Sequence, residues 1–153
     1  MIRFIITIII CLLIFLSPPS FAIRIGDDAP DILGRMTNKK LFKLSSYSGQ
    51  IRLVNFFSVH CKPCKKELPE LSLLEKEFPD IVMIAVHIGD QSIEKVNQFL
   101  SDLSGSPKRV VCSSMAVKTN YGFLGFPHTV IIDKHDRIHQ IIPGYQIPMI
   151  KKY

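Results

Sequence analysis

The sequence predicts a single α/β domain in which helices flank a mixed central sheet. Apolar runs rich in β-branched residues alternate along the chain with segments whose apolar residues recur at helical spacing. Of the 153 residues, 47% are hydrophobic and 21% are charged, a composition that builds a buried core and excludes a disordered chain. At this length we expect one domain with an appendage.

The appendage is residues 1–22. Arg3 precedes an uncharged apolar stretch at 4–16, and two prolines separate that stretch from the small residue Ala22. This order is typical of a secretory signal peptide cleaved after Ala22. The alternative is an uncleaved inner-membrane anchor at 4–16, although a spanning helix needs about 20 apolar residues. Either way we expect the remaining chain to be periplasmic or exported.

Residues 23–50 surround short apolar stretches with turn residues, which predicts an irregular N-terminal extension with one hairpin. The core of the domain, residues 51–153, then opens with a buried strand at 51–59. Pro63 opens an amphipathic helix that ends before Pro79.

The same alternation continues toward the C-terminus. We expect strands at 81–88, 109–112, 128–132 and 138–142, and helices at 92–103 and 115–121. The first two core strands should be parallel because a helix connects them. The last two should be antiparallel, because the residues between them are typical of a hairpin turn.

The formal net charge of +6 comes from lysines and arginines spread along the chain. A small, dispersed excess of this kind is typical of a solvated surface. Together with the export signal, it argues against a nucleic-acid partner.

The cysteines that follow the signal segment are Cys61, Cys64 and Cys112. An odd number in an exported protein argues against a disulfide scaffold and for a reactive pair with one cysteine left over. Residues three apart on a helix lie about 5 to 6 Å apart, which is close to the separation that a disulfide requires. Cys112 is either a buried structural thiol or a third redox partner.

The position of the pair, between a strand and a helix, indicates thiol chemistry. The positive end of a helix lowers the pKa of a nearby thiol, and the surrounding lysines and a protonated His60 act in the same direction. We therefore assign Cys61 as the attacking thiolate and Cys64 as the resolving thiol.

Three other uses of the Cys61–Cys64 spacing are less suited to this chain. A zinc site would need a second ligand pair, and covalent haem would need histidine where Lys65 stands. A structural bridge that closes so small a loop would add little stability. We expect no metal and no cofactor beyond the redox-active cysteines.

The run from Val54 to Cys64 resembles the active-site stretch of the thioredoxin superfamily, and most of all the TlpA/ResA/CcmG branch of extracytoplasmic thioredoxin-like proteins. The segments at 29–31, 122–128 and 130–133 resemble further marks of that family, so the similarity covers about residues 26–145. The resemblance implies a thioredoxin-like fold with a redox-active cysteine pair.

The resemblance also implies roles for residues distant from the cysteines. Pro127 should be a cis proline that lies against the pair, with the Phe126 backbone offering hydrogen bonds to a substrate chain. Asp90 either moves protons to Cys64 or caps the helix that starts at Ser92.

The chain departs from the family pattern at three places. His60 stands where the family has Trp, and Asn55 stands where cytoplasmic thioredoxins carry a buried Asp. We place His60 and Pro63 with Phe126 at the substrate-binding surface. After Gly144 the remaining residues are too few for the family's last helix, so we expect a shortened C-terminus and one undercovered sheet face.

The predicted function is that of an extracytoplasmic thiol-disulfide oxidoreductase. By resemblance it is a protein-disulfide reductant of the cytochrome c maturation type, which acts on protein substrates such as apocytochrome c and receives electrons from a membrane thiol reductase. The alternatives are a copper-binding chaperone that uses Cys61, Cys64 and a histidine such as His60 or His128, and a binding module without catalysis.

Overall fold

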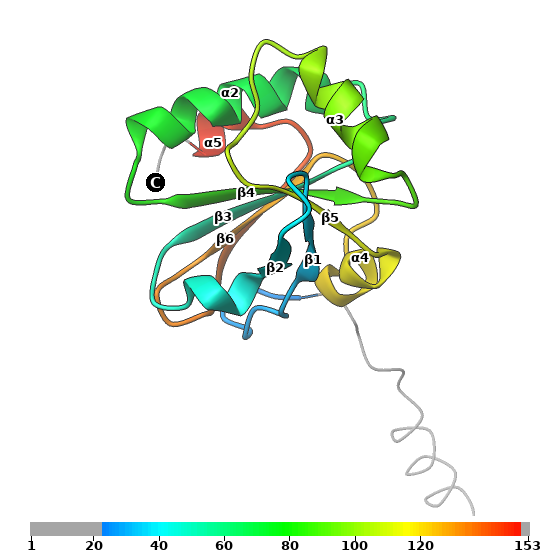
Figure 1. Ribbon diagram of the computed structural model, residues 1–153. Coiled ribbons are helices and arrows are strands. Elements are labelled where there is room, and N and C mark those ends of the chain that lie inside the picture. The colour runs from blue at the N-terminus through cyan, green and yellow to red at the C-terminus, as the bar shows by residue number, and fades with distance from the viewer. Residues whose placement is uncertain (1–22, 151–153) are drawn as a thin grey trace, which may run out of the picture.

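The computed structural model describes residues 23–150, so the predicted signal peptide or membrane anchor at 1–22 lies outside the described residues. Within this range seven strands form one mixed sheet in the order β2-β1-β5-β4-β3-β6-β7. Helices cover both faces of the sheet (Figure 1). The predicted α/β class with a mixed sheet is confirmed.

The strands are β1 (Leu33–Met36), β2 (Leu41–Lys43), β3 (Arg52–Phe57), β4 (Val82–Ile88), β5 (Val110–Ser113), β6 (His128–Ile132) and β7 (Ile138–Pro143). The helices are α2 (Cys64–Glu77), α3 (Ile93–Ser101), α4 (Met115–Tyr121) and α5 (Ile147–Ile150), with a 3-10 turn η1 (Leu44–Tyr47). Each strand and helix predicted from the pattern is present, with ends that differ by a few residues at most.

The centre of the sheet is built as the sequence predicts. Strands β3 and β4 are parallel, and β6 and β7 are antiparallel. All six residues of β3 and all seven of β4 are buried, because helices lie on both faces of these strands. The N-terminal hairpin β1–β2 joins the same sheet, since β1 pairs antiparallel with β5.

Helices α2 and α3 lie on one face of the sheet and α4 lies on the other (Figure 1). The buried stripe of α2 comprises Cys64, Glu67, Leu68, Leu71, Leu74 and Glu75. Pro69 lies inside α2 and lacks the N–H that would continue the helical bonding there. Helix α3 is capped by Ser92, whose hydroxyl accepts a hydrogen bond from the Lys95 backbone N–H.

The C-terminal part described by the structure is the four-residue helix α5, which packs beside α2. Next to it, between α2 and the sheet, lies a cavity of about 200 Å³. Its lining is mostly apolar and includes Leu53, Phe78, Met83 and Ile150.

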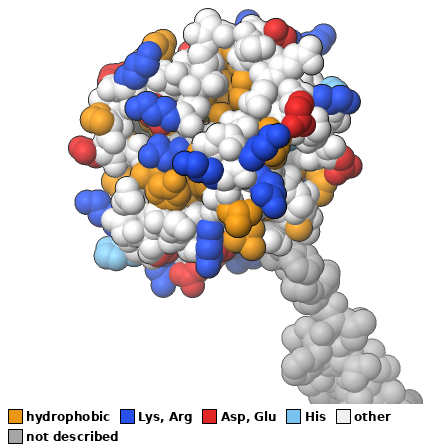
Figure 2. Space-filling view, viewed as in Figure 1, with side chains coloured by type: hydrophobic (Ala, Val, Ile, Leu, Met, Phe, Trp, Pro, Cys, Tyr) orange, Lys and Arg blue, Asp and Glu red, His pale blue; other side chains and the backbone are white. Residues whose placement is uncertain are grey.

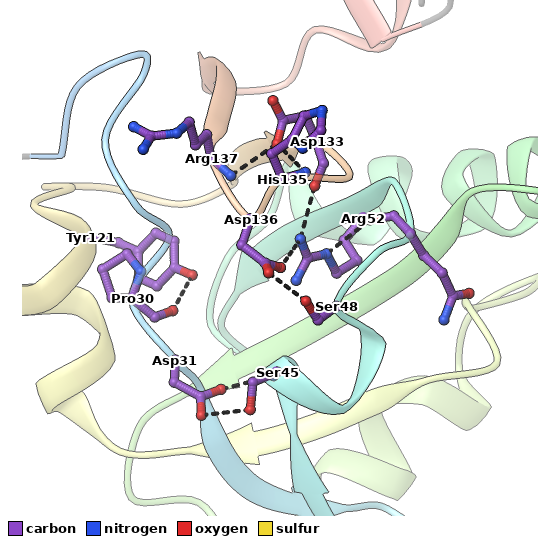
Figure 3. Close-up of polar contacts among 11 residues, drawn as sticks. Pro30, Asp31, Ser45, Ser48, Arg52, Tyr121, Asp133, His135, Asp136 and Arg137 are labelled. Carbon is purple, nitrogen blue, oxygen red and sulfur yellow. Dashed lines mark hydrogen bonds and ion pairs between the residues drawn. The ribbon is translucent and has the colours of Figure 1, made fainter.

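A buried arginine ties the start of β3 to the β6–β7 turn (Figure 3). Arg52 is 1% exposed, and its guanidinium donates to the Asp133 carbonyl oxygen at 2.9 Å. It also forms an ion pair with Asp136, whose carboxylate accepts a further hydrogen bond from the Ser48 hydroxyl. A buried charge is tolerated when it is paired and hydrogen-bonded in this way. The contacts therefore fix the end of the sheet opposite the cysteines.

Candidate active site

The two cysteines form a disulfide at the junction of β3 and α2, with a Cα–Cα distance of 5.3 Å. Helix α2 begins at Cys64, which is fully buried, and the partly exposed Cys61 lies in the turn that precedes the helix. The Cys64 backbone N–H points at Cys61 Sγ, with an N···S distance of 3.2 Å. The positive end of α2 is thus directed at the sulfur of Cys61.

Several basic residues are close to Cys61 along the chain. Lys62, Lys65, Lys66 and His60 are all exposed, and Lys65 Nζ lies 5.7 Å from the centre of the Phe99 ring. Positive charge near a thiolate lowers the thiol pKa. The helix end and these side chains therefore favour ionisation of Cys61 over that of the buried Cys64.

A buried carboxyl group lies on the same side of α2, one turn after Cys64. Glu67 is 0% exposed, and its Oε2 accepts a hydrogen bond from Asn55 Nδ2 at 2.7 Å. Asn55 Nδ2 also donates to Thr129 Oγ1 at 2.9 Å, across the β3–β6 pair. Burial raises the pKa of Glu67 from 4.5 to about 7, and the Asn55 hydrogen bond offsets part of this effect. The carboxyl group is therefore poised to exchange a proton near neutral pH.

Glu67 is the residue that the sequence reasoning missed, and Asp90 is the residue it put forward instead. Asp90 is exposed in the turn between β4 and α3, whereas Glu67 is buried. The cap of α3 is Ser92 itself, so the capping role suggested for Asp90 is wrong. A helical-wheel reading could have found Glu67, because it falls on the stripe that contains Cys64 and Leu71.

The loop before β6 lies beside the end of β3. The register pairs His128 with Phe56, which places Pro127 next to the residues that lead into the cysteine turn. The Phe126–Pro127 peptide bond is cis, the isomer that the resemblance implies. Phe126 packs against the apolar cluster that contains Cys61 and Cys64.

A surface depression runs along this loop. It is lined by residues 122–128 with Pro143 and Gly144. Leu124, which is 95% exposed, stands at this surface, and Lys118 Nζ lies 5.6 Å from the centre of the Phe126 ring. The depression offers an apolar surface with a cation at its rim.

Two further histidines are buried in the core rather than presented to a ligand. Burial lowers the pKa of His87 to about 4, with a contribution from the positive charge of His60, and burial lowers the pKa of His128 to about 4. His128 stacks on Phe123 with ring centres 4.8 Å apart. Among residues 23–150, no three or more His, Cys, Asp or Glu side chains are grouped so that they could hold a metal ion.

The remaining cysteine of the described chain, Cys112, has no disulfide partner and is partly exposed at the end of β5. It is therefore more exposed than the buried structural thiol that was one of the two roles expected for it. It packs against the apolar cluster of Cys64 and Phe57, and burial raises its pKa, with a smaller contribution from Glu94. These features describe a thiol that stays protonated at neutral pH.

Residues 25–141 match the model of the AhpC/TSA family. The chain is 27% identical over 131 residues to the thioredoxin-like protein YneN of Bacillus subtilis, which covers 84% of this chain and 76% of YneN. It is 28% identical over 121 residues to the thiol-disulfide oxidoreductase ResA of the same organism, which covers 78% of this chain and 67% of ResA.

Solved structures show the same fold. A putative thiol:disulfide interchange protein DsbE from Chlorobium tepidum superposes with a TM-score of 0.73 at 20% identity, covering 86% of this chain and 92% of that one. The thioredoxin domain of a thiol-disulfide oxidoreductase from Bacteroides vulgatus has a TM-score of 0.73 at 21% identity, covering 86% and 98%. The fold is thioredoxin-like, as the resemblance implied.

Proposed function

The chain belongs to the AhpC/TSA family, and from this premise we propose that it is a thiol-disulfide oxidoreductase of the ResA type that reduces protein disulfides outside the cytoplasm. The observation that carries the proposal is the Cys61–Cys64 disulfide at the start of α2, with a helical N–H directed at Cys61 Sγ. Relatives named thiol-disulfide oxidoreductase match over most of the chain.

In the proposed reaction the reduced Cys61 thiolate attacks one sulfur of a substrate disulfide. A mixed disulfide forms, and the other substrate sulfur leaves as a thiolate and takes up a proton. Cys64 then loses its proton and attacks Cys61 Sγ, which releases the reduced substrate and closes the Cys61–Cys64 bridge. The two electrons come from the cysteine pair, which a thiol reductase must then restore.

We propose that Glu67 is the base that accepts the proton from the Cys64 thiol. Cys64 is buried, so its thiol ionises only with difficulty unless a base takes the proton. Glu67 lies one turn further along the same face of α2, and its pKa of about 7 matches the pH at which the reaction would operate.

We place the substrate chain along the loop that contains Phe126 and Pro127. The depression beside this loop, the exposed Leu124 and the position of Phe126 against the cysteine cluster support that placement. His60 and Pro63 would border the same surface, since both are exposed next to the cysteine turn.

The location and the substrate class are proposed from the sequence and the relatives. Residues 1–22 support export, because a positive charge is followed by an apolar stretch and then by small residues. The segment would either be cleaved after Ala22 or be retained as an anchor. Within residues 23–150, no helix combines the length and the apolar character needed to cross a bilayer. We further propose a role in cytochrome c maturation, with apocytochrome c as substrate and a membrane thiol reductase as electron donor, on the ground of the family resemblance of the sequence around Cys61 and Cys64.

The test uses a peptide that carries a bridged Cys-x-x-Cys-His segment, as apocytochrome c does. A reduced Cys64→Ser variant should accumulate a mixed disulfide between Cys61 and the peptide, because the resolving thiol is gone, and a Cys61→Ser variant should form none. Mass analysis after acid quenching measures both. Failure of the Cys64→Ser variant to form any adduct would exclude the proposed attack.

The reduction potential decides the direction. A value near the −270 mV typical of thioredoxin supports a reductant, whereas a value near −120 mV indicates an oxidant. The potential is measured by equilibration with glutathione or dithiothreitol buffers. An oxidising value would reject the cytochrome c role while leaving the exchange chemistry in place.

A further inference from the structure

The hairpin β1–β2 presents an unusual set of side chains to solvent. The strands pair as Leu33 with Lys43 and Arg35 with Leu41. Directly opposite residues, and residues two apart on one strand, point to the same face of a sheet. These four side chains therefore share one face, which we call the hairpin face, with the two leucines on one diagonal and the two cations on the other.

The hairpin face is open to solvent. Leu33 is 63% exposed and Leu41 is 78% exposed, while Arg35 and Lys43 are also exposed. The apolar residue of β2 that serves the core is Phe42, which points to the opposite side and is 5% exposed. The two leucines thus contribute nothing to the core that buries Phe42.

Positive charge dominates around these leucines. Lys39 and Lys40 extend from the turn between the two strands and are exposed. Two acids lie beside the cations: Asp31 is 3.8 Å from Lys43 and Glu94 is 3.7 Å from Lys39, and both pairs are solvent-exposed. Four cations against two acids leave a net positive surface. In Figure 2, Lys and Arg side chains gather around hydrophobic ones on the side of the molecule that carries the hairpin, and acidic side chains lie mostly toward the rim.

We propose that the hairpin face docks the folded domain onto an anionic lipid bilayer surface. Interfacial binding combines burial of apolar side chains at the headgroup boundary with attraction between cations and anionic lipids. Leucines that stand diagonally among long cationic side chains supply both, because lysine stems lie along apolar surface while their charges stay in the headgroup layer.

The composition of the patch favours lipid over a protein partner. Protein interfaces concentrate aromatic residues at a dry centre and are depleted in lysine. The cations of this patch are one arginine and three lysines, and its exposed apolar members are aliphatic. A bilayer requires no complementary shape, so an alternating patch of this kind is sufficient.

The experiment measures sedimentation of the full-length chain with vesicles. One set is phosphatidylcholine alone, and the other contains about one third phosphatidylglycerol. Residues 1–22 are the same in every variant, so differences between variants come from the folded domain. We expect stronger partitioning to the anionic vesicles, and this gain should weaken with added salt.

Lys40→Glu should lower partitioning to anionic vesicles about thirtyfold, since two units of charge change at about 1 kcal/mol each. Lys134→Glu is the matched control: Lys134 is exposed in the β6–β7 turn, away from the hairpin, and the net charge changes equally. Leu41→Gln should lower partitioning about fivefold, whereas Leu124→Gln should not.

Three outcomes would overturn the proposal. One is equal loss in Lys40→Glu and Lys134→Glu, which would mean that net charge alone acts. Another is the absence of any preference for anionic vesicles in the wild-type chain. The third is binding to soluble polyglutamate that Lys40→Glu abolishes, together with unchanged vesicle binding of Leu41→Gln, which would indicate an acidic polypeptide as the partner. Far-UV circular dichroism of each variant checks that it remains folded.

Discussion

Replacing Glu67 with glutamine tests the buried carboxyl group through the pH dependence of stability. The pKa of Glu67 is about 7 in the folded chain against 4.5 for an unperturbed glutamate. Below pH 4.5 both the folded and the unfolded chain hold the proton. As the pH rises toward 7, the unfolded chain releases the proton first, so the free energy of unfolding falls. The difference between the two pKa values corresponds to about 3 kcal/mol.

Glutamine removes this loss while its side-chain oxygen still accepts the hydrogen bond from Asn55. The free energy of unfolding of the oxidised Glu67→Gln variant, relative to the wild type, should therefore rise by about 3 kcal/mol between pH 4.5 and 8. Urea unfolding followed by circular dichroism at several pH values measures it. Glu77→Gln, at an exposed position of the same helix, is the control and should show no such trend.

A Glu67→Gln curve parallel to that of the wild type across this pH range would refute the reasoning, because it would mean that the carboxyl group ionises normally. The same variant tests the proton transfer. If Glu67 accepts the proton of Cys64, release of substrate from the mixed disulfide should slow, while the first attack by Cys61 should be little changed.

Three further changes test other parts of the structure by urea unfolding. In Gly34→Ala the new Cβ would lie 2.5 Å from the Cys112 carbonyl oxygen, so the free energy of unfolding should fall by about 1 to 3 kcal/mol. Gly125→Ala is the control, because a Cβ there meets no heavy atom within 4 Å and the free energy of unfolding should not change. Ser92→Ala removes the cap of α3 and should cost about 1 kcal/mol. The pKa of His128 falls from 6.5 to about 4 on folding, so this imidazole lowers the free energy of unfolding by up to about 3 kcal/mol as the pH falls from 6.5 to 4. His128→Asn removes this contribution, so its free energy of unfolding should rise relative to that of the wild type as the pH falls, and a constant difference between the two would contradict this assignment.

The helices and strands were predictable because burial of their side chains places apolar residues at a regular spacing along the sequence. The helix at Met115–Tyr121 and the strand at His128–Ile132 match their predicted bounds. Both segments carry apolar residues at the spacing of their own structure, and glycine or proline stands at their ends. The position of the cysteine pair at the start of α2 followed from the same signals.

The site was harder to predict because its chemistry depends on three-dimensional neighbours. The run Lys65-Lys66-Glu67 is charged throughout, so the inward position of Glu67 is visible in the sequence only from its helical spacing to Cys64 and Leu71. The hydrogen bond that Glu67 accepts comes from Asn55 of β3, which also donates to Thr129 of β6, and these residues come from distant parts of the chain. Asp90 was proposed because the family carries an acidic residue at a similar position, and a family resemblance does not show whether that residue is exposed.

The two edge strands of the sheet affect whether the protein aggregates with its own substrates. An oxidoreductase that handles partly folded chains risks having such chains add to an open strand and nucleate aggregates. Here β2 has three residues and ends at Lys43, while β7 ends at Pro143, which has no N–H to donate. At the beginning of β7 the Gly26 N–H donates to the Ile138 carbonyl oxygen, and the Ile138 N–H donates to the Asp27 carbonyl oxygen. Both margins therefore resist templated β-aggregation, and a substrate can meet the cysteines without being recruited into the sheet.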